Sequence, residues 1–432
     1  MMNPIRVTIV LALLVLGLGT YILFVDIPKT RQFKKQETQE QQLLPFDDRA
    51  ITQITWATPT ETITLVRDDK WRWTITEPMQ SPADAREVRT ILRALKIGKI
   101  KRIIENEQNT LDTYGLDPPY ITLTLTTSTD TWEIALGDAG PFAPSLYVQT
   151  KSNNQVVLTT LDVMTFAKKS LVNFRLKDIL LFDRDRVQEV QIQKGQTTMV
   201  MSRVAGAHSL TPQWMFKSPM TGPADKTAVG TLLMDLGGLT ALGFVDSEED
   251  KQRIFKQPPR INISVKILEG TRHHQVNLYY FADAEKAYAI TTPTSPWFEI
   301  SPGILRPLTH GPFYFQDKRL FGMEVQDIAM LKVQTPDSDY TLISQHDTWV
   351  LEENPITELD QQFVKLFVSR VVDVPAEIQL PDSTNETIDH GLARPTATIY
   401  GINRRGEQKG RLQLGKREKG LVYAKGAALP GL

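Results

Sequence analysis

Three aspartates carry the clearest potential for chemistry in this sequence, because each stands at the same distance after a tryptophan. The matched pairs are Trp73 and Asp84, Trp214 and Asp225, and Trp349 and Asp360. A carboxylate can act as a general acid or base, and an indole ring can stack on a ligand. Each aspartate, however, begins an apolar helical pattern at the expected N3 position, where it binds free N–H groups and favours the helix dipole. We therefore expect the aspartates to stabilise helix starts and the tryptophans to fill cores.

Histidine and cysteine supply no further catalytic pattern. The histidines are His208, His273, His274, His310, His346 and His390. None has a metal-binding spacing such as H-E-x-x-H, and we expect His273-His274 to lie in a solvated hairpin turn. The chain has no cysteine, which excludes disulfides and thiolate metal sites. We predict no catalytic, cofactor-binding or metal-binding residues, no cofactor, and no enzyme activity.

The composition is that of an ordinary globular chain without a nucleic-acid partner. Of 432 residues, 41% are hydrophobic, which is enough for well-packed cores in two to four domains. Lysine plus arginine number 49 and aspartate plus glutamate number 50, so the net charge is -1. Binding to a phosphate backbone requires a basic surplus or stripe, and neither is present.

The segment Val7–Val25 is apolar throughout and carries no charge. As a helix it would span about 28 Å, close to the roughly 30 Å of a bilayer core. A cleaved signal peptide usually has a shorter apolar region that ends in small residues. We therefore expect residues 1–26 to form an uncleaved transmembrane anchor, followed by a polar, Gln-rich linker over residues 27–50. Basic residues are more numerous after the span, which by itself would favour a cytoplasmic soluble part.

The soluble part is organised as an internal repeat. The spacings that relate the three tryptophans also relate Tyr147, Tyr288 and Tyr423, which we expect to pack within strands. The same spacings superpose the apolar positions of three amphipathic helical segments. The predicted modules cover residues 51–182, 183–323 and 324–432. We expect the third module to be C-terminally incomplete, because it reaches Tyr423 but lacks the last strand and closing helix of the other two. Either the chain caps itself there or the sequence is a fragment of a longer one.

Each module opens with alternating segments that predict strands, such as Thr62–Arg67 in the first copy. A proline after the tryptophan ends the strand, because proline cannot donate to a sheet ladder. Ser81 and Pro82 are expected as the N-cap and N1 of a helix. More strands and a short helix near Leu161–Leu171 follow. The predicted fold class is α+β: three tandem copies of an antiparallel-sheet-plus-helix module after one N-terminal transmembrane helix.

Several of these motifs together resemble a known family. They are W-x4-P from Trp73, the P-A-D helix start, Y-G-L-D-P-P at Tyr114–Pro119, Leu136-Gly137 and Tyr147-Val148. The pattern is similar to the bacterial family called domain of unknown function 4340, over most of residues 51–432. The second copy lacks the Y-G-L part, and the third has His390-Gly391-Leu392 in its place. The motifs are structural, so the resemblance implies no catalytic residue.

The resemblance implies an N-terminal anchor with repeats outside the bacterial cytoplasmic (inner) membrane, in the periplasm. It also implies a genetic setting beside an ABC-type transporter and a gliding-motility-like auxiliary protein. Two functions follow as hypotheses. The first is an accessory or scaffold subunit of an ABC-type transporter or envelope complex, with the permease and auxiliary subunit as partners and residues 7–25 in the membrane. The second is a stand-alone envelope module that binds a glycan or lipid.

If the modules bind partners, the surfaces that differ most between copies are the best candidates. Identical surfaces would compete for one partner, so the binding residues should lie where the copies are least alike. These stretches are Gly137–Ser145, Ala205–Gln213 and Thr271–Gln275.

Overall fold

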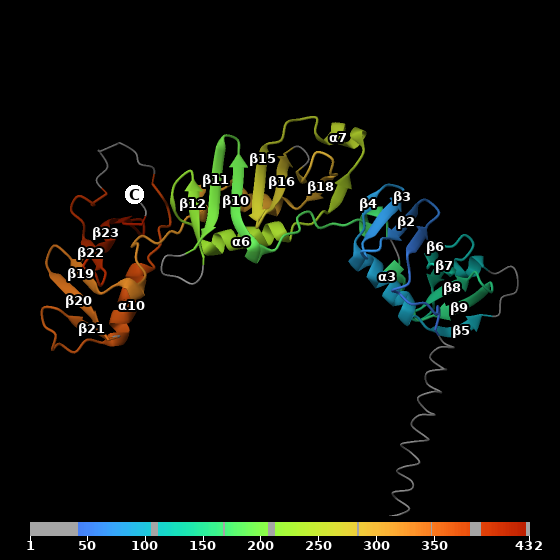
Figure 1. Cartoon of the computed structure of the whole chain (residues 1–432), viewed down its shortest axis with the longest axis horizontal. Helices are drawn as coiled ribbons and strands as arrows, with labels where there is room; N and C mark the ends of the chain where they lie inside the picture. Colours follow the sequence, from blue (N-terminus) through green and yellow to red (C-terminus); the bar gives the residue numbers. More distant parts are fainter. Residues whose placement is uncertain are drawn as a thin grey trace, which may run out of the picture. The chain divides into compact units, whose positions relative to one another are not determined.

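The computed structural model describes residues 42–104, 111–166, 169–205, 212–282, 285–346, 348–380 and 390–428 (Figure 1). The predicted anchor, residues 1–26, and much of the predicted linker, residues 27–50, lie outside these ranges. None of the helices formed by the described residues is long and apolar enough to cross a membrane. The chain divides into two compact units, Met1–Lys177 and Asp178–Leu432.

The first unit contains one antiparallel sheet, the first sheet, with the order β4-β3-β2-β1-β6-β7-β8-β9-β5. Its strands are β1 Gln53–Ala57, β2 Thr62–Arg67, β3 Trp73–Glu77, β4 Ser81–Pro82, β5 Ile100–Ile104, β6 Ile121–Thr126, β7 Thr131–Ala139, β8 Leu146–Thr150 and β9 Gln155–Thr159. Helix α3 (Ala85–Ile97) follows β4. The one-turn helix η2 (Asp112–Tyr114) precedes β6, and α4 (Val163–Phe166) and α5 (Leu171–Phe174) follow β9.

The second unit contains two sheets. The second sheet has the order β13-β12-β11-β10-β15-β16-β17-β18-β14, which is the order of the first sheet when strands are matched along the chain. Its strands are β10 Val187–Lys194, β11 Thr197–Val204, β12 Gln213–Ser218, β13 Gly222–Pro223, β14 Gly243–Val245, β15 Ile261–Glu269, β16 Arg272–Phe281, β17 Lys286–Ile290 and β18 Trp297–Ile300. Its helices are η3 Arg184–Arg186, α6 Lys226–Gly237, α7 Glu248–Ile254, η4 Pro302–Ile304, α8 Leu305–Thr309 and α9 Pro312–Phe315.

The third sheet has six strands in the order β21-β20-β19-β22-β23-β24. They are β19 Met330–Gln334, β20 Asp339–Gln345, β21 Thr348–Leu351, β22 Ala397–Ile402, β23 Gln408–Glu418 and β24 Leu421–Gly426. Helices η5 (Val325–Asp327) and α10 (Gln361–Val372) accompany them. This order matches β3-β2-β1-β6-β7-β8 of the first sheet. The predicted α+β class, with mainly antiparallel sheets, is confirmed.

Local sequence explains these elements. In β6 the apolar residues Ile121, Leu123 and Leu125 alternate with threonines, so one face of the strand is buried and the other is partly open. In α3 the buried residues Val88, Ile91, Leu92 and Leu95 form one stripe at helical spacing. Figure 1 shows the equivalent helix of the second sheet, α6, lying along one face of its strands. Each sheet therefore has a core between one face and an amphipathic helix.

The starts of the three main helices differ from the sequence prediction. Asp84, Asp225 and Asp360 are the N-caps of α3, α6 and α10, and not N3 residues. Ser81 and Pro82 form β4 and pair with β3, so they precede the helix. The closing helix expected near Leu161–Leu171 is two short helices, α4 and α5.

Short apolar segments ahead of each sheet contribute to its core. Leu43, Leu44 and Phe46 belong to the first core, although they lie in the predicted linker. Ile179 and Leu180 belong to the second core, and Leu320, Phe321 and Met323 to the third. In each case a backbone hydrogen bond joins the segment to the residues that follow the main helix, for example Leu320 N to Val374 O at 3.0 Å.

Candidate functional site

The three repeated tryptophans lie in cores. Trp73, Trp214 and Trp349 are buried members of the first, second and third core clusters. In two of them an arginine of the neighbouring strand lies over the indole ring. The guanidinium carbon of Arg67 is 5.7 Å from the Trp73 ring centre, and that of Arg203 is 5.3 Å from the Trp214 ring centre. These rings therefore pack with the chain's own side chains.

The three repeated aspartates are engaged by the helices that they cap. The carboxylate of Asp225 accepts hydrogen bonds from Thr227 N at 2.8 Å and Ala228 N at 3.1 Å. Asp360 accepts from the two equivalent amides of α10. Asp84 accepts from the backbone and the guanidinium of Arg86. Burial alone would raise the pKa of Asp84, but the hydrogen bonds and charge of Arg86 hold that pKa below its usual range.

Each repeated tyrosine lies in a strand and packs against another aromatic ring. The pairs, with their centroid separations, are Tyr114 and Tyr147 at 4.8 Å, Phe255 and Tyr288 at 5.6 Å, and His390 and Tyr423 at 4.4 Å. The partner rings are themselves related by the spacings that relate the tyrosines. Extending the repeat to Tyr114 would have revealed these pairs in the sequence.

His273 and His274 correct a second expectation, because both lie in strand β16 and not in a hairpin turn. The turn between β15 and β16 is Gly270-Thr271, and Gly270 takes the left-handed conformation that such a turn requires. His274 Nε2 lies 2.9 Å from Glu269 Oε2. This hydrogen bond holds the pKa of the Glu269 carboxyl below its usual range.

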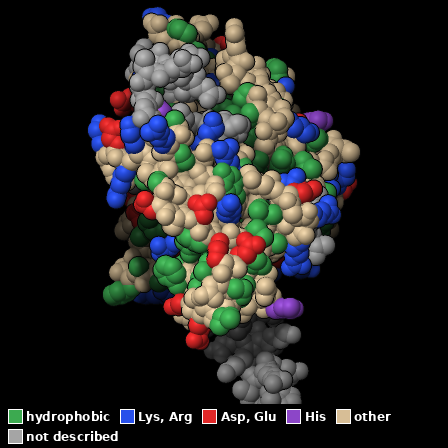
Figure 2. All heavy atoms as spheres, turned by 90° about the vertical axis from the view of Figure 1, so that its left-hand side faces the viewer, with side chains coloured by type: hydrophobic (Ala, Val, Ile, Leu, Met, Phe, Trp, Pro, Cys, Tyr) green, Lys and Arg blue, Asp and Glu red, His purple; other side chains and the backbone are tan. Residues whose placement is uncertain are grey.

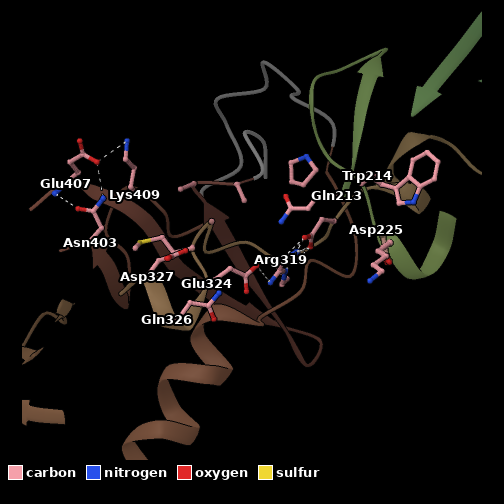
Figure 3. Close-up of a pocket in the computed structure, with 18 of the residues that line it drawn as sticks. Gln213, Trp214, Asp225, Arg319, Glu324, Gln326, Asp327, Asn403, Glu407 and Lys409 are labelled. Carbon is pink, nitrogen blue, oxygen red and sulfur yellow. Dashed lines mark hydrogen bonds and ion pairs between the residues drawn. The ribbon is translucent and has the colours of Figure 1, made fainter. Parts of the chain in front are cut away.

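A cleft of about 1230 Å³ lies in the second unit (Figure 3). One side comes from β12 and the start of α6, with Trp214, Asp225 and Lys226. The opposite side comes from the turn between β22 and β23 and from the start of β23, residues 403–409. Arg319 and Glu324, which lie between these sides in Figure 3, belong to the segment that joins the second sheet to the third.

Two groups of charges in the cleft are already paired. Arg319 bonds Asp317 and Glu324, with N–O distances of 2.8 Å to each. The hydrogen bond with Asp317 is the main reason why the pKa of Arg319 is raised. On the opposite side, Glu407 accepts a hydrogen bond from Asn403 at 2.9 Å and faces Lys409 at 3.6 Å. Each of these groups lies within one short segment of the lining.

Other charges in the cleft stay available for a ligand. Lys226, Arg404 and Arg405 are exposed, and within the described part of the chain their side chains form no ion pair. Among the acidic lining residues, Asp225 and Asp327 are also without an ion pair there. The lining as a whole has five basic and five acidic side chains, so the cleft carries no net charge and offers unpaired groups of both signs to a ligand. Figure 2 likewise shows basic, acidic and hydrophobic side chains interspersed over one whole face of the molecule.

A second cleft, of about 840 Å³, lies at the far end of the second sheet. Its wall includes Phe281 and the buried ring of Tyr288. Burial raises the pKa of the Tyr288 hydroxyl. Lys256 and Arg260 also line this cleft and have no ion pair with another described residue, whereas Lys286 pairs with Glu299 at 2.8 Å.

The structure brings some of the sequence-selected residues to these clefts. Trp214 and Asp225 border the larger cleft and Tyr288 borders the smaller one, while the other repeat positions lie elsewhere. Of the variable stretch Ala205–Gln213, Gln213 lines the larger cleft, and residues 206–211 lie outside the described residues. The basic turn Arg404-Arg405 was missed, although N-R-R-G between two alternating segments is a turn signal.

Of the comparisons with known proteins, the one with family models finds a match. Neither a curated protein nor a solved structure matches this chain. Within the described ranges, no group of three or more histidine, aspartate or glutamate side chains is placed to hold a metal ion. Residues 73–258, from β3 to just beyond α7, match the model of the family described as Domain of unknown function (DUF4340), which is the family that the sequence motifs resemble.

Proposed function

We propose that this chain is a membrane-anchored, extracytoplasmic accessory or scaffold subunit of an ABC-type transporter or envelope complex, and that it acts by binding another polypeptide. It would comprise three tandem copies of one antiparallel-sheet-plus-helix module after a transmembrane helix at residues 7–25. Support for the repeat comes from the shared strand order of the first two sheets and from the three matched ring pairs. The repeated residues stabilise the fold, so we expect the partner to bind surfaces that differ between the copies.

The observation that carries this proposal is the larger cleft of the second unit. Its volume of about 1230 Å³ exceeds the roughly 300–1,000 Å³ usual for small-molecule pockets. Its lining is rich in charged side chains, whereas small-molecule pockets are mostly apolar with a few polar groups. A polypeptide segment fits both properties. The unpaired Lys226, Arg404 and Arg405 can pair with aspartate or glutamate of such a segment, and the unpaired Asp327 can pair with a lysine or arginine.

The proposal is tested by co-purification from membranes in mild detergent through a C-terminal tag. The wild-type chain should retain an integral membrane complex. The double variant Arg404→Glu, Arg405→Glu should lose that complex, because it replaces two exposed cations of the cleft with carboxylates without touching a core. The matched control Arg89→Glu, Arg93→Glu makes the same change of charge on the exposed face of α3 and should keep the partner. A monodisperse chain without a membrane partner would overturn the proposal.

The anchor and its orientation are tested separately. A cysteine at Ser152, an exposed residue between β8 and β9, should react with a membrane-impermeant thiol reagent in intact spheroplasts. Large domains can cross the membrane regardless of flanking charge, so the basic residues after the span do not forbid this orientation. Labelling that appears only after lysis would place the soluble part in the cytoplasm instead.

A second candidate function, binding of an anionic glycan or lipid headgroup, is favoured by the smaller cleft. Its aromatic wall and the unpaired Lys256 and Arg260 suit a compact anionic ligand. Native mass spectrometry of the chain purified from its own cells would show a bound species in this case. The variant Lys256→Glu, Arg260→Glu should be purified without that bound species. If the wild-type protein also carries no bound species, this function is rejected.

A further inference from the structure

The three most exposed large apolar side chains among the described residues of the first unit are Phe142, Met164 and Ile97. Their exposed fractions are 79%, 75% and 67%. Phe142 lies in the turn between β7 and β8, Met164 lies in α4, and Ile97 is the last residue of α3. None of the three contributes to the core of the first sheet, so the folding of that sheet does not explain their type.

Hydrogen bonds on both sides of Phe142 stabilise the turn that carries it. Ser145 Oγ donates to the carbonyl oxygen of Phe142 at 2.5 Å, and Gly140 N donates to Ser145 O at 3.0 Å. From β5, the last strand of the sheet, Lys101 Nζ donates to Pro144 O at 2.9 Å. Because the turn is already ordered, the exposed ring loses little conformational freedom when it binds another molecule.

Ile97 and Met164 lie at the same end of the sheet as this turn. Strands β8, β9 and β5 are neighbours at one edge of the first sheet (Figure 1). Thr159 of β9 pairs with the first residue of β5 and with the first residue of β8, so the turn before β8 lies at this end. Ile97 comes shortly before β5. The next residue of β9's exit, Thr160, donates from N to Lys99 O at 2.9 Å and leads into α4 with Met164, and α4 contacts α3.

The chain also enters the first unit at this end. Gln42, the first described residue, forms a bridge with Lys99, and Leu43 N donates a hydrogen bond to Gly98 O at 3.0 Å. The predicted membrane span ends at Val25, and residues 26–41 connect it to Gln42. A chain extends by at most about 3.6 Å per residue, so Gln42 lies within about 60 Å of the bilayer that holds the span. The tether therefore keeps the effective concentration of lipid at this end high.

The other two copies do not share these exposed apolar side chains. At the positions of Ile97 and Phe142, the spacings that relate the tryptophans place a glycine or an acidic residue, namely Gly238, Asp373, Asp283 and Glu418. At the position of Met164 they place Leu305 in the second copy, where it is buried in the core. Phe142 also lies within Gly137–Ser145, one of the stretches that differ most between the copies. The exposed apolar side chains therefore belong to the copy that follows the predicted anchor, and not to the repeated fold.

We propose that this end of the first unit lies on the lipid surface of the membrane that holds the anchor. Ile97, Phe142 and Met164 enter the boundary between headgroups and acyl chains, as the apolar faces of peripheral membrane proteins do. The anchor and this contact together hold the first unit in one orientation beside the membrane. The inference rests on the proposed function for the anchor at residues 7–25, and it does not depend on which polypeptide the chain binds.

Charged side chains of both signs surround the three apolar ones. Lys99, Lys101 and Arg102 are exposed in or beside β5, and Asp138 and Asp162 are exposed at the same end of the sheet. Because the charges are mixed, attraction to anionic headgroups is not the main source of binding. The strength of the contact depends instead on the apolar area that the lipid covers, so it should persist when salt screens the charges.

The test uses a single introduced cysteine, since the chain has none of its own. The full-length chain with Met164→Cys is labelled with an environment-sensitive fluorophore and incorporated through its anchor into phosphatidylcholine nanodiscs. We expect blue-shifted emission, and loss of fluorescence when part of the lipid carries a spin label near the top of its acyl chain. The matched control is Ser152→Cys, an exposed position in the turn after β8 and therefore at the opposite end of that strand from Phe142. Its probe should emit as in water and should not be quenched.

A second arm keeps the probe at position 164 and adds Phe142→Asp. Most of the quenching should be lost, because a carboxylate is costly to bring into lipid. The matched control Trp71→Asp removes another exposed aromatic ring, in the turn between β2 and β3, and should leave the quenching unchanged. Both changes are at exposed positions, so folding is preserved, and circular dichroism of each variant checks this.

Retention of the chain by the nanodiscs is measured in the same samples, so that the two proposals fail in different ways. A chain that the nanodiscs do not retain would overturn the anchor and this inference with it. A retained chain whose probe at position 164 emits as in water would overturn the inference alone. A probe that is shielded in native membranes but not in nanodiscs would make a protein, and not lipid, the occupant of this surface. Release of the probe at high salt would overturn the assignment to apolar side chains.

Discussion

The ring of His390 lies against the ring of Tyr423, with their centroids 4.4 Å apart, and the Nδ1 atom of His390 is buried without a hydrogen-bond partner among the described residues. The matching pair in the second sheet, Phe255 and Tyr288, has an apolar ring in place of the imidazole. The third pair therefore keeps the ring contact and adds a buried polar atom to which no described residue forms a hydrogen bond.

We expect His390→Phe to stabilise the third sheet. A buried polar group without a partner costs about 1–3 kcal/mol, and phenylalanine keeps the ring contact while removing that group. The gain should be about 1 kcal/mol, measured as a higher urea midpoint of the full-length chain. As a control, His390→Ala should lower the midpoint, because it removes the ring altogether. A lower midpoint for His390→Phe would indicate that Nδ1 has a partner such as an ordered water.

Trp214→Ala should destabilise the second unit by about 3–5 kcal/mol, which is the usual cost of deleting a buried aromatic side chain. Trp214 is buried in the second core, so the variant leaves a cavity between β12 and α6. The effect can be read from urea unfolding followed by circular dichroism, which does not depend on tryptophan fluorescence. The exposed Trp71 offers the control, and Trp71→Ala should change stability by less than about 1 kcal/mol. Similar effects of the two changes would show that Trp214 does not pack in a core.

Asp225→Ala should cost about 0.5–2 kcal/mol, because it removes the N-cap of α6. Asp225→Asn is the matched variant, since an asparagine side chain also accepts hydrogen bonds from the first-turn amides. The urea midpoint of the asparagine variant should therefore stay near that of the wild type. If Asp225→Ala left the midpoint unchanged but abolished co-purification, the role of Asp225 would be in binding and not in capping.

The sequence predicted those parts of the fold that depend on local pattern. The alternation in Thr62–Arg67 and Ile121–Thr126 and the stripe in α3 identify these elements directly. Strand β5 was missed because its pairing with β9 joins distant segments, and its burial pattern lacks a clean alternation. The cleft was missed for a similar reason. Its lining residues come from β12, α6, the joining segment and the β22–β23 turn, and only tertiary packing brings them together.

Two glycines should respond to alanine in opposite directions. A Cβ on Gly137 would lie 2.1 Å from the carbonyl oxygen of Tyr114, so Gly137→Ala forces backbone to move and should cost about 1–3 kcal/mol. Gly230 is inside α6 and has no atom within 4 Å of such a Cβ, so Gly230→Ala should stabilise by about 0.5–1 kcal/mol. Thermal melts of both variants would show the contrast. A neutral Gly137→Ala would mean that the Y-G-L turn does not press against β7.

The contribution of Asp84 to stability should depend on pH. Its pKa in the folded chain lies below the usual value near 3.9, because hydrogen bonds from Arg86 and the charge of Arg86 outweigh burial. A carboxyl with a lowered folded pKa binds protons more readily in the unfolded chain. Its stabilising contribution is therefore complete above the unfolded pKa and is lost as the pH falls through the folded value.

Asp84→Asn is the variant that isolates this contribution, because asparagine can still cap α3 but carries no charge. At pH 7 the wild type should be more stable than Asp84→Asn, and the difference should shrink steadily below about pH 4. The urea midpoints of the two proteins should be measured in parallel from pH 7 to pH 2. The difference between the two midpoints isolates Asp84, because all other titrating groups are the same in both proteins. A difference that stayed constant over this range would contradict the ion pair, since a neutral hydrogen bond alone has no such pH dependence.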